Sequence, residues 1–151
     1  MSISTLLHRP PVYFGLAVLV QLALDYYLPI RPLIPFEWLS VSTFLFAGGA
    51  LLGAFALSEF RRNDTPHDPY ATAKQLVTTG VYRFSRNPMY LGLSLILAGL
   101  AWRLGSLGPW LMVPLFMALM EVAFIRPEER RLTTAFGDAY TQYRRQTRRW
   151  L

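Results

Sequence analysis

The stretch GVYRFSRNPMYLG in the second half of the chain concentrates groups that could bind a small charged ligand. Asn87 is a suitable N-cap and Pro88 suits the first position of a helix, so a helix is expected to begin here. The free N–H groups at a helix start, together with the guanidinium of Arg86, can hold an anion such as a carboxylate. Tyr90 on the first turn can reach the same point, and Gly92 leaves room for a ligand or a second backbone.

A second group of polar residues follows the last apolar run of the chain. Pro127 is expected to break or kink the helix that precedes it, and Glu128 and Glu129 are favourable in the first turn of a new helix. Because Glu129, Leu132 and Phe136 follow i, i+3, i+7 spacing, they share one face, which should turn toward the protein. Glu129 is therefore predicted to point inward and Glu128 to point toward the rim.

Each of these motifs also has a purely structural interpretation. The helix start could be an interfacial anchor, with Arg86 on a lipid phosphate and Tyr90 in the aromatic belt. The paired acids of the tail could simply complement the helix dipole. Glu121, which lies within the last apolar run, could pair with Arg103 or Arg126.

Four apolar runs have to position these residues, at 12–28, 38–58, 88–102 and 104–125. A membrane span needs ~20 mostly apolar helical residues, and the second run, apolar on every face, disfavours a soluble bundle. A turn from Gly105 to Pro109 joins the last two runs as a hairpin, and Gly137 is expected to end the first helix of the tail. The expected fold class is all-α, a polytopic integral membrane protein with about four transmembrane helices plus a C-terminal amphipathic helical tail.

Composition supports a membrane protein and excludes several other classes. Of the 151 residues, 53% are hydrophobic and 16% are charged, which is less charge than a soluble domain usually carries. Cysteine is absent, which excludes disulfides and thiolate metal sites, and His8 and His67 are too isolated to suggest a metal site. The formal net charge of +6 fits the anionic face of a bilayer better than it fits nucleic acid.

The basic residues predict the orientation of the chain in the membrane. With the N-terminus in the cytosol, thirteen Lys and Arg side chains lie inside, and only Arg31 and Arg103 lie outside. Both termini and the active site are therefore predicted to be cytosolic, and a bacterial inner membrane is the expected location.

Small residues mark one face of the second apolar run. Gly49 and Gly53 lie about one helical turn apart, with Ala50 and Ala54 beside them, and this spacing lets helices approach closely. The glycines could form the seam of a homodimer or pack against another helix of the same chain. The second interpretation is preferred, because this motif is frequent in membrane helices.

The motifs of the second half occur in an order that resembles a known superfamily. The residues are Gly80-Val81-Tyr82, Arg86-Asn87-Pro88-Met89-Tyr90-Leu91-Gly92, Glu128-Glu129, Leu132, Phe136-Gly137, Tyr140 and Tyr143. Together they resemble the signature of the isoprenylcysteine carboxyl methyltransferase and phospholipid methyltransferase superfamily, from about residue 76 to the C-terminus. Asn87 stands where many relatives have histidine, and asparagine can donate and accept a hydrogen bond but cannot titrate.

The resemblance implies an integral membrane methyltransferase that uses S-adenosylmethionine without a Rossmann domain. It would methylate a lipidic or small hydrophobic acceptor, through a carboxylate, amine or thiol, by in-line transfer. A single membrane domain would cover residues 1–151, with the first two spans in 1–75 and a methyltransferase-like core in 76–151. The catalytic residues would be Arg86 and Glu129, and the cofactor-binding residues would be Tyr82, Arg86, Asn87, Tyr90, Gly92, Glu128, Glu129 and Tyr140.

Two other functions remain open at this point. Membrane sterol-type reductases carry a similar Arg–Pro–Tyr hairpin and bind NADPH, but they are generally longer, and this chain lacks an obvious extra basic pocket for the 2′-phosphate. A non-catalytic membrane adaptor is also compatible with the sequence, since every motif has a structural interpretation.

Overall fold

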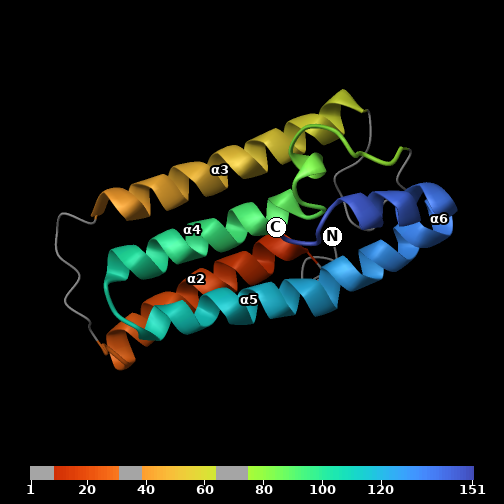
Figure 1. Ribbon diagram of the computed structural model, residues 1–151. Helices are drawn as coiled ribbons and strands as arrows, with labels where there is room; N and C mark the ends of the chain where they lie inside the picture. Colours follow the sequence, from red (N-terminus) through yellow and green to blue (C-terminus); the bar gives the residue numbers. More distant parts are fainter. Residues whose placement is uncertain (1–8, 31–38, 64–74) are drawn as a thin grey trace, which may run out of the picture.

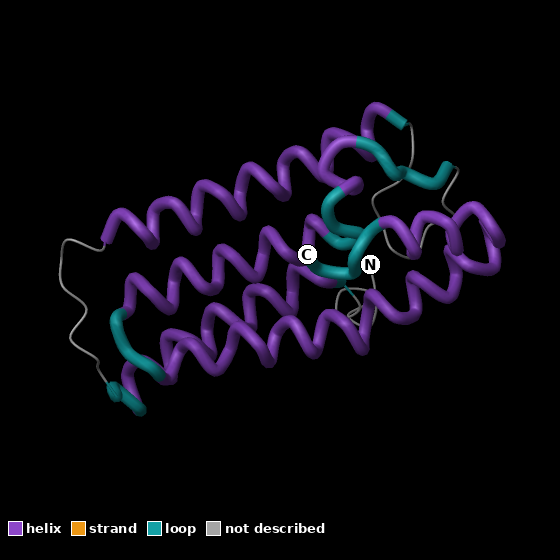
Figure 2. Tube along the Cα trace, in the orientation of Figure 1, coloured by secondary structure: helices purple, strands orange, loops and turns teal. Residues whose placement is uncertain are grey.

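The computed structural model describes residues 9–30, 39–63 and 75–151, and these residues form helices and turns without any strand. In chain order the elements are α2 (Pro10–Tyr27), α3 (Leu39–Arg62), the 3₁₀ turn η2 (Gly80–Arg83), α4 (Pro88–Leu104), the 3₁₀ turn η3 (Gly108–Leu111), α5 (Met112–Met120), the π-helical turn η4 (Glu121–Ile125) and α6 (Arg126–Gln146). Figures 1 and 2 show the long helices lying side by side. The prediction of an all-α fold is confirmed for the described residues.

Two helices are long and apolar enough to cross a membrane, by length and composition. They are α3 and the helical stretch Gly108–Gln146, whereas α4 is a shorter apolar helix. Leu19 of α2, Phe44 of α3 and Leu115 of α5 are each more than half exposed. Contact of these apolar faces with lipid costs no free energy, whereas their contact with water is unfavourable. The prediction of about four spans is therefore supported for two helices and stays a prediction for α2 and α4.

Small residues bring α3 and α4 close together. A Cβ atom added to Gly49 would lie 2.5 Å from the carbonyl oxygen of Gly92, and one added to Gly92 would lie 2.7 Å from that of Gly49. Only glycine allows this backbone approach. Gly92 thus makes room for a second backbone, and Gly49 packs within its own chain, as preferred above. A Cβ on Gly53 would meet no atom within 4 Å, and a homodimer stays a prediction.

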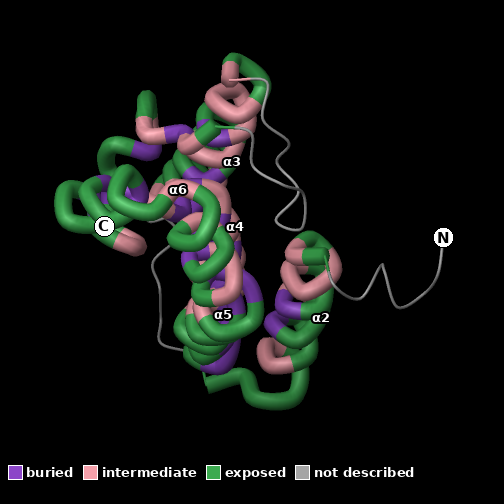
Figure 3. Tube along the Cα trace, turned by 90° about the vertical axis from the view of Figure 1, so that its right-hand side faces the viewer, coloured by how far each residue is buried: buried purple, intermediate pink, exposed green. Residues whose placement is uncertain are grey.

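The main core lies between α2, α4 and the last helix. In Figure 3, α4 has α3 on one side and α2 with α5 on the other. The core side chains that are no more than 3% exposed are Ala17, Leu97, Phe116, Met120, Phe124 and Ile125. Dense packing of this kind resists relative movement of the helices. It therefore fixes the start of α4 against the start of α6.

Helical structure continues through Pro127, so the predicted break is wrong, whereas the alternative of a kink stays a prediction. The π-helical turn η4 stands directly before this proline, and α6 continues from Arg126. Proline lacks an N–H donor and crowds the carbonyl four residues earlier, and the wider π turn accommodates both effects. The predicted end at Gly137 appears as a bend with φ 50° and ψ −120°, after which helix resumes to Gln146.

The two ends of the molecule differ in charge. At one end Gly105, with φ 75°, ends α4, and the N–H of Leu107 donates to the carbonyl of Ile30 at 2.7 Å. The hairpin turn is thus confirmed, with the next helical turn beginning at Gly108. The start of α2, η2 and α6 lie toward the other end of the long helices (Figure 1). Of the arginines that the structure describes, all except Arg103 belong to this second end.

Candidate functional site

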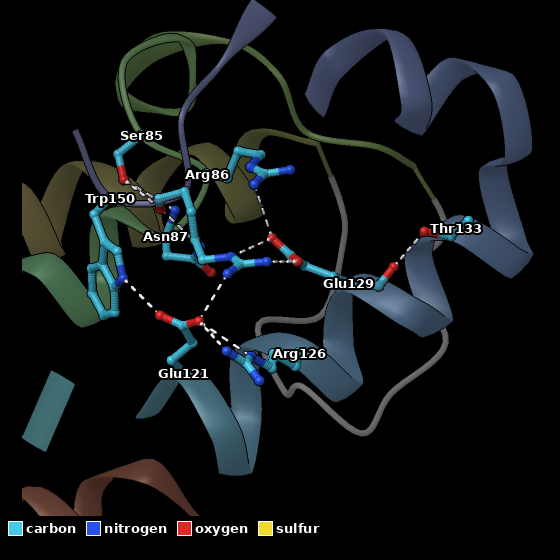
Figure 4. A network of polar contacts seen from close by, with 9 residues as sticks. Ser85, Arg86, Asn87, Glu121, Arg126, Glu129, Thr133 and Trp150 are labelled. Atoms are coloured by element: carbon cyan, nitrogen blue, oxygen red, sulfur yellow. Dashed lines mark hydrogen bonds and ion pairs between the residues drawn. The ribbon is translucent and has the colours of Figure 1, made fainter. Parts of the chain in front are cut away.

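Arg86 lies in the turn between η2 and α4, and its guanidinium faces α6 (Figure 4). The side chain is 9% exposed, and Nη2 lies 3.2 Å from Oε1 of Glu129. The other two guanidinium nitrogens, Nε and Nη1, are buried without a hydrogen-bond partner. Buried donors are normally paired. An acceptor supplied by a ligand would therefore be stabilised at this position.

Asn87 stands at the start of α4, but its side chain does not cap the helix as predicted. The backbone carbonyl of Asn87 accepts a hydrogen bond from the N–H of Leu91 at 3.0 Å, as expected at a helix start. The side-chain amide instead donates to the carbonyl of Arg149 at 2.9 Å. The physical reason is that the end of the chain passes beside this helix start, and its carbonyl requires a donor.

The residues that pass beside the helix start form a segment that we call the C-terminal strap, residues 148–150. The N–H of Arg86 donates to the carbonyl of Arg148 at 3.0 Å, and the hydroxyl of Ser85 donates to that of Arg149 at 3.4 Å. Trp150 packs against the main core. The strap is therefore held by its backbone and by an aromatic side chain.

Two acids and three arginines form one connected cluster (Figure 4). Arg149 donates to both oxygens of Glu129, from Nε to Oε1 at 3.1 Å and from Nη2 to Oε2 at 2.7 Å. Its Nη1 donates to Oε1 of Glu121 at 2.8 Å, and Arg126 reaches the same oxygen at 2.9 Å. With Arg86, three cations face two carboxylates, so the cluster carries a net positive charge. The hydrogen bond to Glu129 holds the pKa of Arg149 above its ordinary value.

The two adjacent acids lie in different environments, as their spacing predicted. Glu129 is 8% exposed, whereas Glu128 is partly exposed. Both belong to α6, the polar continuation of the last apolar helix. Desolvation raises the pKa of Glu128 to about 7. The charged form of Glu128 is therefore disfavoured, while Glu129 is the counter-ion of two arginines.

The predicted tyrosines Tyr82 and Tyr140 are both buried at this end. Tyr140 is 1% exposed, and burial raises its pKa to about 12, with the charges of Glu129 and Arg86 also acting on its hydroxyl. The carbonyl of Tyr82 accepts a hydrogen bond from the hydroxyl of Tyr143 at 2.7 Å. These contacts join η2 to the last turns of α6.

Tyr90 and Gly92 take part in helix packing. Tyr90 belongs to the main core, where its ring centroid lies 6.4 Å from that of Phe124, and Gly92 faces α3. Their predicted roles in ligand binding stay predictions.

A cavity of about 650 Å³ opens at the same end of the molecule. It is lined by Leu76, Thr78, Arg83, Ala139, Gln142, Tyr143, Gln146 and Thr147. This volume lies within the range of small-molecule sites, ~300–1,000 Å³. The ring centroid of Tyr143 lies 6.2 Å from that of Tyr140, so these two rings connect the cavity wall with the neighbourhood of Glu129.

Arg149 and Trp150 are the site residues that sequence reasoning missed. Arg149 belongs to a run of tail arginines, and such a run predicts charges that face lipid headgroups or water. No local pattern distinguishes it from Arg144, Arg145 or Arg148, because its partners lie 20 and 28 residues away. Among the described parts of the chain, no group of three His, Asp or Glu side chains could hold a metal ion.

Comparisons with known proteins agree with the sequence motifs. The profile of the family described as phospholipid methyltransferase matches residues 38–139, more than half of the chain. An uncharacterised protein of Haemophilus influenzae is 45% identical over 65 residues, which are 42% of this chain and 100% of that protein. The protein-S-isoprenylcysteine O-methyltransferase of Schizosaccharomyces pombe is 36% identical over 70 residues, which are 46% of this chain and 30% of the yeast protein.

The yeast match spans less than a third of that enzyme, so it supports the class of chemistry and not the acceptor. No solved structure matches the chain at a significant level. The family match and the yeast relative together support a membrane methyltransferase. The chain therefore belongs to the phospholipid methyltransferase family.

Proposed function

We propose that this protein is an integral membrane methyltransferase that uses S-adenosylmethionine to methylate a lipidic or small hydrophobic acceptor. Membership of the phospholipid methyltransferase family supports methyl transfer. The observation that carries the cofactor assignment is the buried guanidinium of Arg86, which has two nitrogens without partners.

Arg86 fits the carboxylate of the cofactor's methionine moiety. Nε and Nη1 are buried without a partner, and they lie on different edges of the guanidinium with Nη2 between them, so a carboxylate would accept a charged hydrogen bond from one of the two. Each buried donor left unpaired costs ~1–3 kcal/mol, so a bound carboxylate would recover that energy. The excess of arginines over carboxylates in the cluster also favours an anionic group of the ligand over a cationic one.

The remaining predicted residues support this binding in different ways. Glu129 is proposed to orient Arg86, because both of its oxygens are engaged by arginines; the cofactor's amino and ribose groups would need other partners. Tyr82 and Tyr140 are proposed to form the wall next to the cavity, and Asn87 to hold the strap. Glu128, Tyr90 and Gly92 are proposed to shape the rim and the α4 side of the site.

Bound S-adenosylmethionine supplies a methyl group on a sulfonium that is already a good leaving group. The protein's residues therefore chiefly have to align the donor with the acceptor and to exclude water. Arg86 fixes one end of the ligand, and the C-terminal strap lies against the start of α4 beside it. A carboxylate acceptor needs no general base, whereas an amine or thiol acceptor must lose a proton.

The acceptor is proposed to reach the site from the bilayer. The apolar outer faces of α2, α3 and α5 support an intramembrane position for the helices. We propose four spans, with both termini and the arginine-rich end on the cytosolic side of a bacterial inner membrane. The positive-inside tendency supports this orientation.

Titration calorimetry of the detergent-purified protein with S-adenosylmethionine and, separately, with NADPH tests the function. We expect binding of the first and none of the second. Arg86→Ala removes a charged hydrogen bond to the ligand, worth about 1.5–3 kcal/mol, so the affinity should fall at least about tenfold. Arg130→Ala is the matched control, since Arg130 is an exposed arginine of α6. Unchanged affinity in Arg86→Ala would assign Arg86 to lipid anchoring, and binding of NADPH alone would favour a reductase.

A further inference from the structure

Glu129 has a different relation to each of its two arginine partners. Arg149 meets it in a bidentate arrangement that uses both carboxylate oxygens, at 3.1 and 2.7 Å. Arg86 makes a single contact, at 3.2 Å, through Nη2. A bidentate pair is the preferred geometry for an arginine and a carboxylate, so only one of the two arginines can have it. Arg149 occupies that position.

This division leaves Arg86 incompletely paired. Its Nε and Nη1 are buried and without partners, although a carboxylate stands beside the same guanidinium. If the second oxygen of Glu129 were free, Arg86 could pair with both oxygens and satisfy more of its donors. The contact between Arg149 and Glu129 therefore keeps the donors of Arg86 available.

Arg149 is well fixed in this role. Its carbonyl accepts hydrogen bonds from Asn87 at 2.9 Å and from Ser85 at 3.4 Å. Its Nη1 also bonds Glu121 at 2.8 Å, and Trp150 donates to the other oxygen of Glu121 at 3.4 Å. Arg149 is therefore held in place beside Arg86 by its backbone and through two acids.

We infer that Arg149 is a positioning residue of the ligand site, which engages Glu129 so that Arg86 keeps an unpaired N–H donor, at Nε or Nη1, for the ligand's carboxylate. The inference rests on the proposed function, since that function supplies the carboxylate. Arg149 itself does not have to touch the ligand. Its effect should therefore be confined to ligands that carry the carboxylate.

Two probes separate this role from a general structural one. S-adenosylhomocysteine carries the amino acid with its carboxylate, whereas 5′-methylthioadenosine has the same nucleoside and thioether with a methyl group in place of the whole amino-acid chain. The wild-type protein should prefer the first. Arg149→Ala should weaken binding of S-adenosylhomocysteine about tenfold, as for the loss of one charged hydrogen bond, and should leave 5′-methylthioadenosine unchanged.

The neighbouring residue provides the matched control. Arg148→Ala removes the same charge from the same strap, and the Arg148 side chain is exposed, so both affinities should stay at wild-type values. If Arg149→Ala does not fold, Arg149→Lys carries the test. Lysine keeps the charge but cannot pair with Glu129 in a bidentate manner, so the preference for S-adenosylhomocysteine should still fall several-fold.

A double-mutant cycle with Arg86→Ala completes the experiment. Because Arg149 acts through Arg86, removing Arg149 should cost no further affinity once Arg86 is absent. Three outcomes would overturn the inference without affecting the proposed function. They are an unchanged preference for S-adenosylhomocysteine in Arg149→Ala, an equal loss of affinity for both probes, and tighter binding of S-adenosylhomocysteine by that variant. Failure of the wild-type protein to bind either probe would overturn the proposed function and the inference with it.

Discussion

Replacing Glu129 by glutamine removes one negative charge from the cluster while keeping the shape of the side chain. Glu129 accepts three contacts from two arginines, at 2.7, 3.1 and 3.2 Å. Glutamine retains one acceptor oxygen, so at least the 2.7 Å contact or the other two must be lost. A hydrogen bond between charged groups contributes about 1.5–3 kcal/mol. The loss is therefore at least about 1.5 kcal/mol, roughly a tenfold change in an equilibrium constant.

The expected result is a difference between adjacent variants. Glu129→Gln should lower the affinity for S-adenosylmethionine ten- to thirtyfold, by order of magnitude, because Arg86 loses the carboxylate that orients it. Glu128→Gln should change it less than about threefold, because Glu128 is partly exposed at the rim. The affinities are measured by calorimetric titration at about pH 8. At that pH Glu128, with its raised pKa of about 7, is mostly ionised, so each substitution removes about one charge.

A thermal melt of each variant checks that the protein is folded, and Glu129→Gln should melt at a lower temperature as well, since two arginines lose a counter-ion. Equal and small effects on affinity would refute the role of Glu129 in orienting Arg86. The two acids would then only complement the dipole of α6. A larger loss in Glu128→Gln would make Glu128 the acid that serves the ligand.

Two further predictions concern stability. Gly49→Ala places a Cβ 2.5 Å from the carbonyl oxygen of Gly92, so it should lower the free energy of unfolding by about 1–3 kcal/mol. Gly48→Ala is the control, because a Cβ at Gly48 meets no atom within 4 Å. Equal melting temperatures for the two variants would contradict the close approach of α3 and α4. Because burial raises the pKa of Glu128 to about 7, the folded state holds this proton more tightly than the unfolded chain, so the stability it contributes is present below about pH 4.5 and is lost as the pH rises through 7. Glu128→Gln should therefore lose less thermal stability than the wild-type protein over that interval, and parallel melting curves would refute the desolvation of Glu128.

Local sequence patterns determined the elements and several of their ends. The apolar runs became helices, and Pro88 and Gly105 mark the two ends of α4 because each has a backbone preference that acts without tertiary partners. The spacing of Glu129 with Leu132 and Phe136 predicted which of the paired acids is buried, because helical periodicity alone sets that face. The ordered motifs of the second half also indicated the superfamily that the comparisons support.

The tertiary structure decided how the charged groups are paired. Asn87 looked like a side-chain cap, but its amide bonds the strap, because a carbonyl 62 residues later lies within reach. Pro127 looked like a break, but the π turn before it keeps the helix continuous. Arg149 is indistinguishable in sequence from the other tail arginines, and only the folded chain brings it to Glu129 and Glu121. Pairing of charges depends on distances between segments, and no local periodicity encodes those distances.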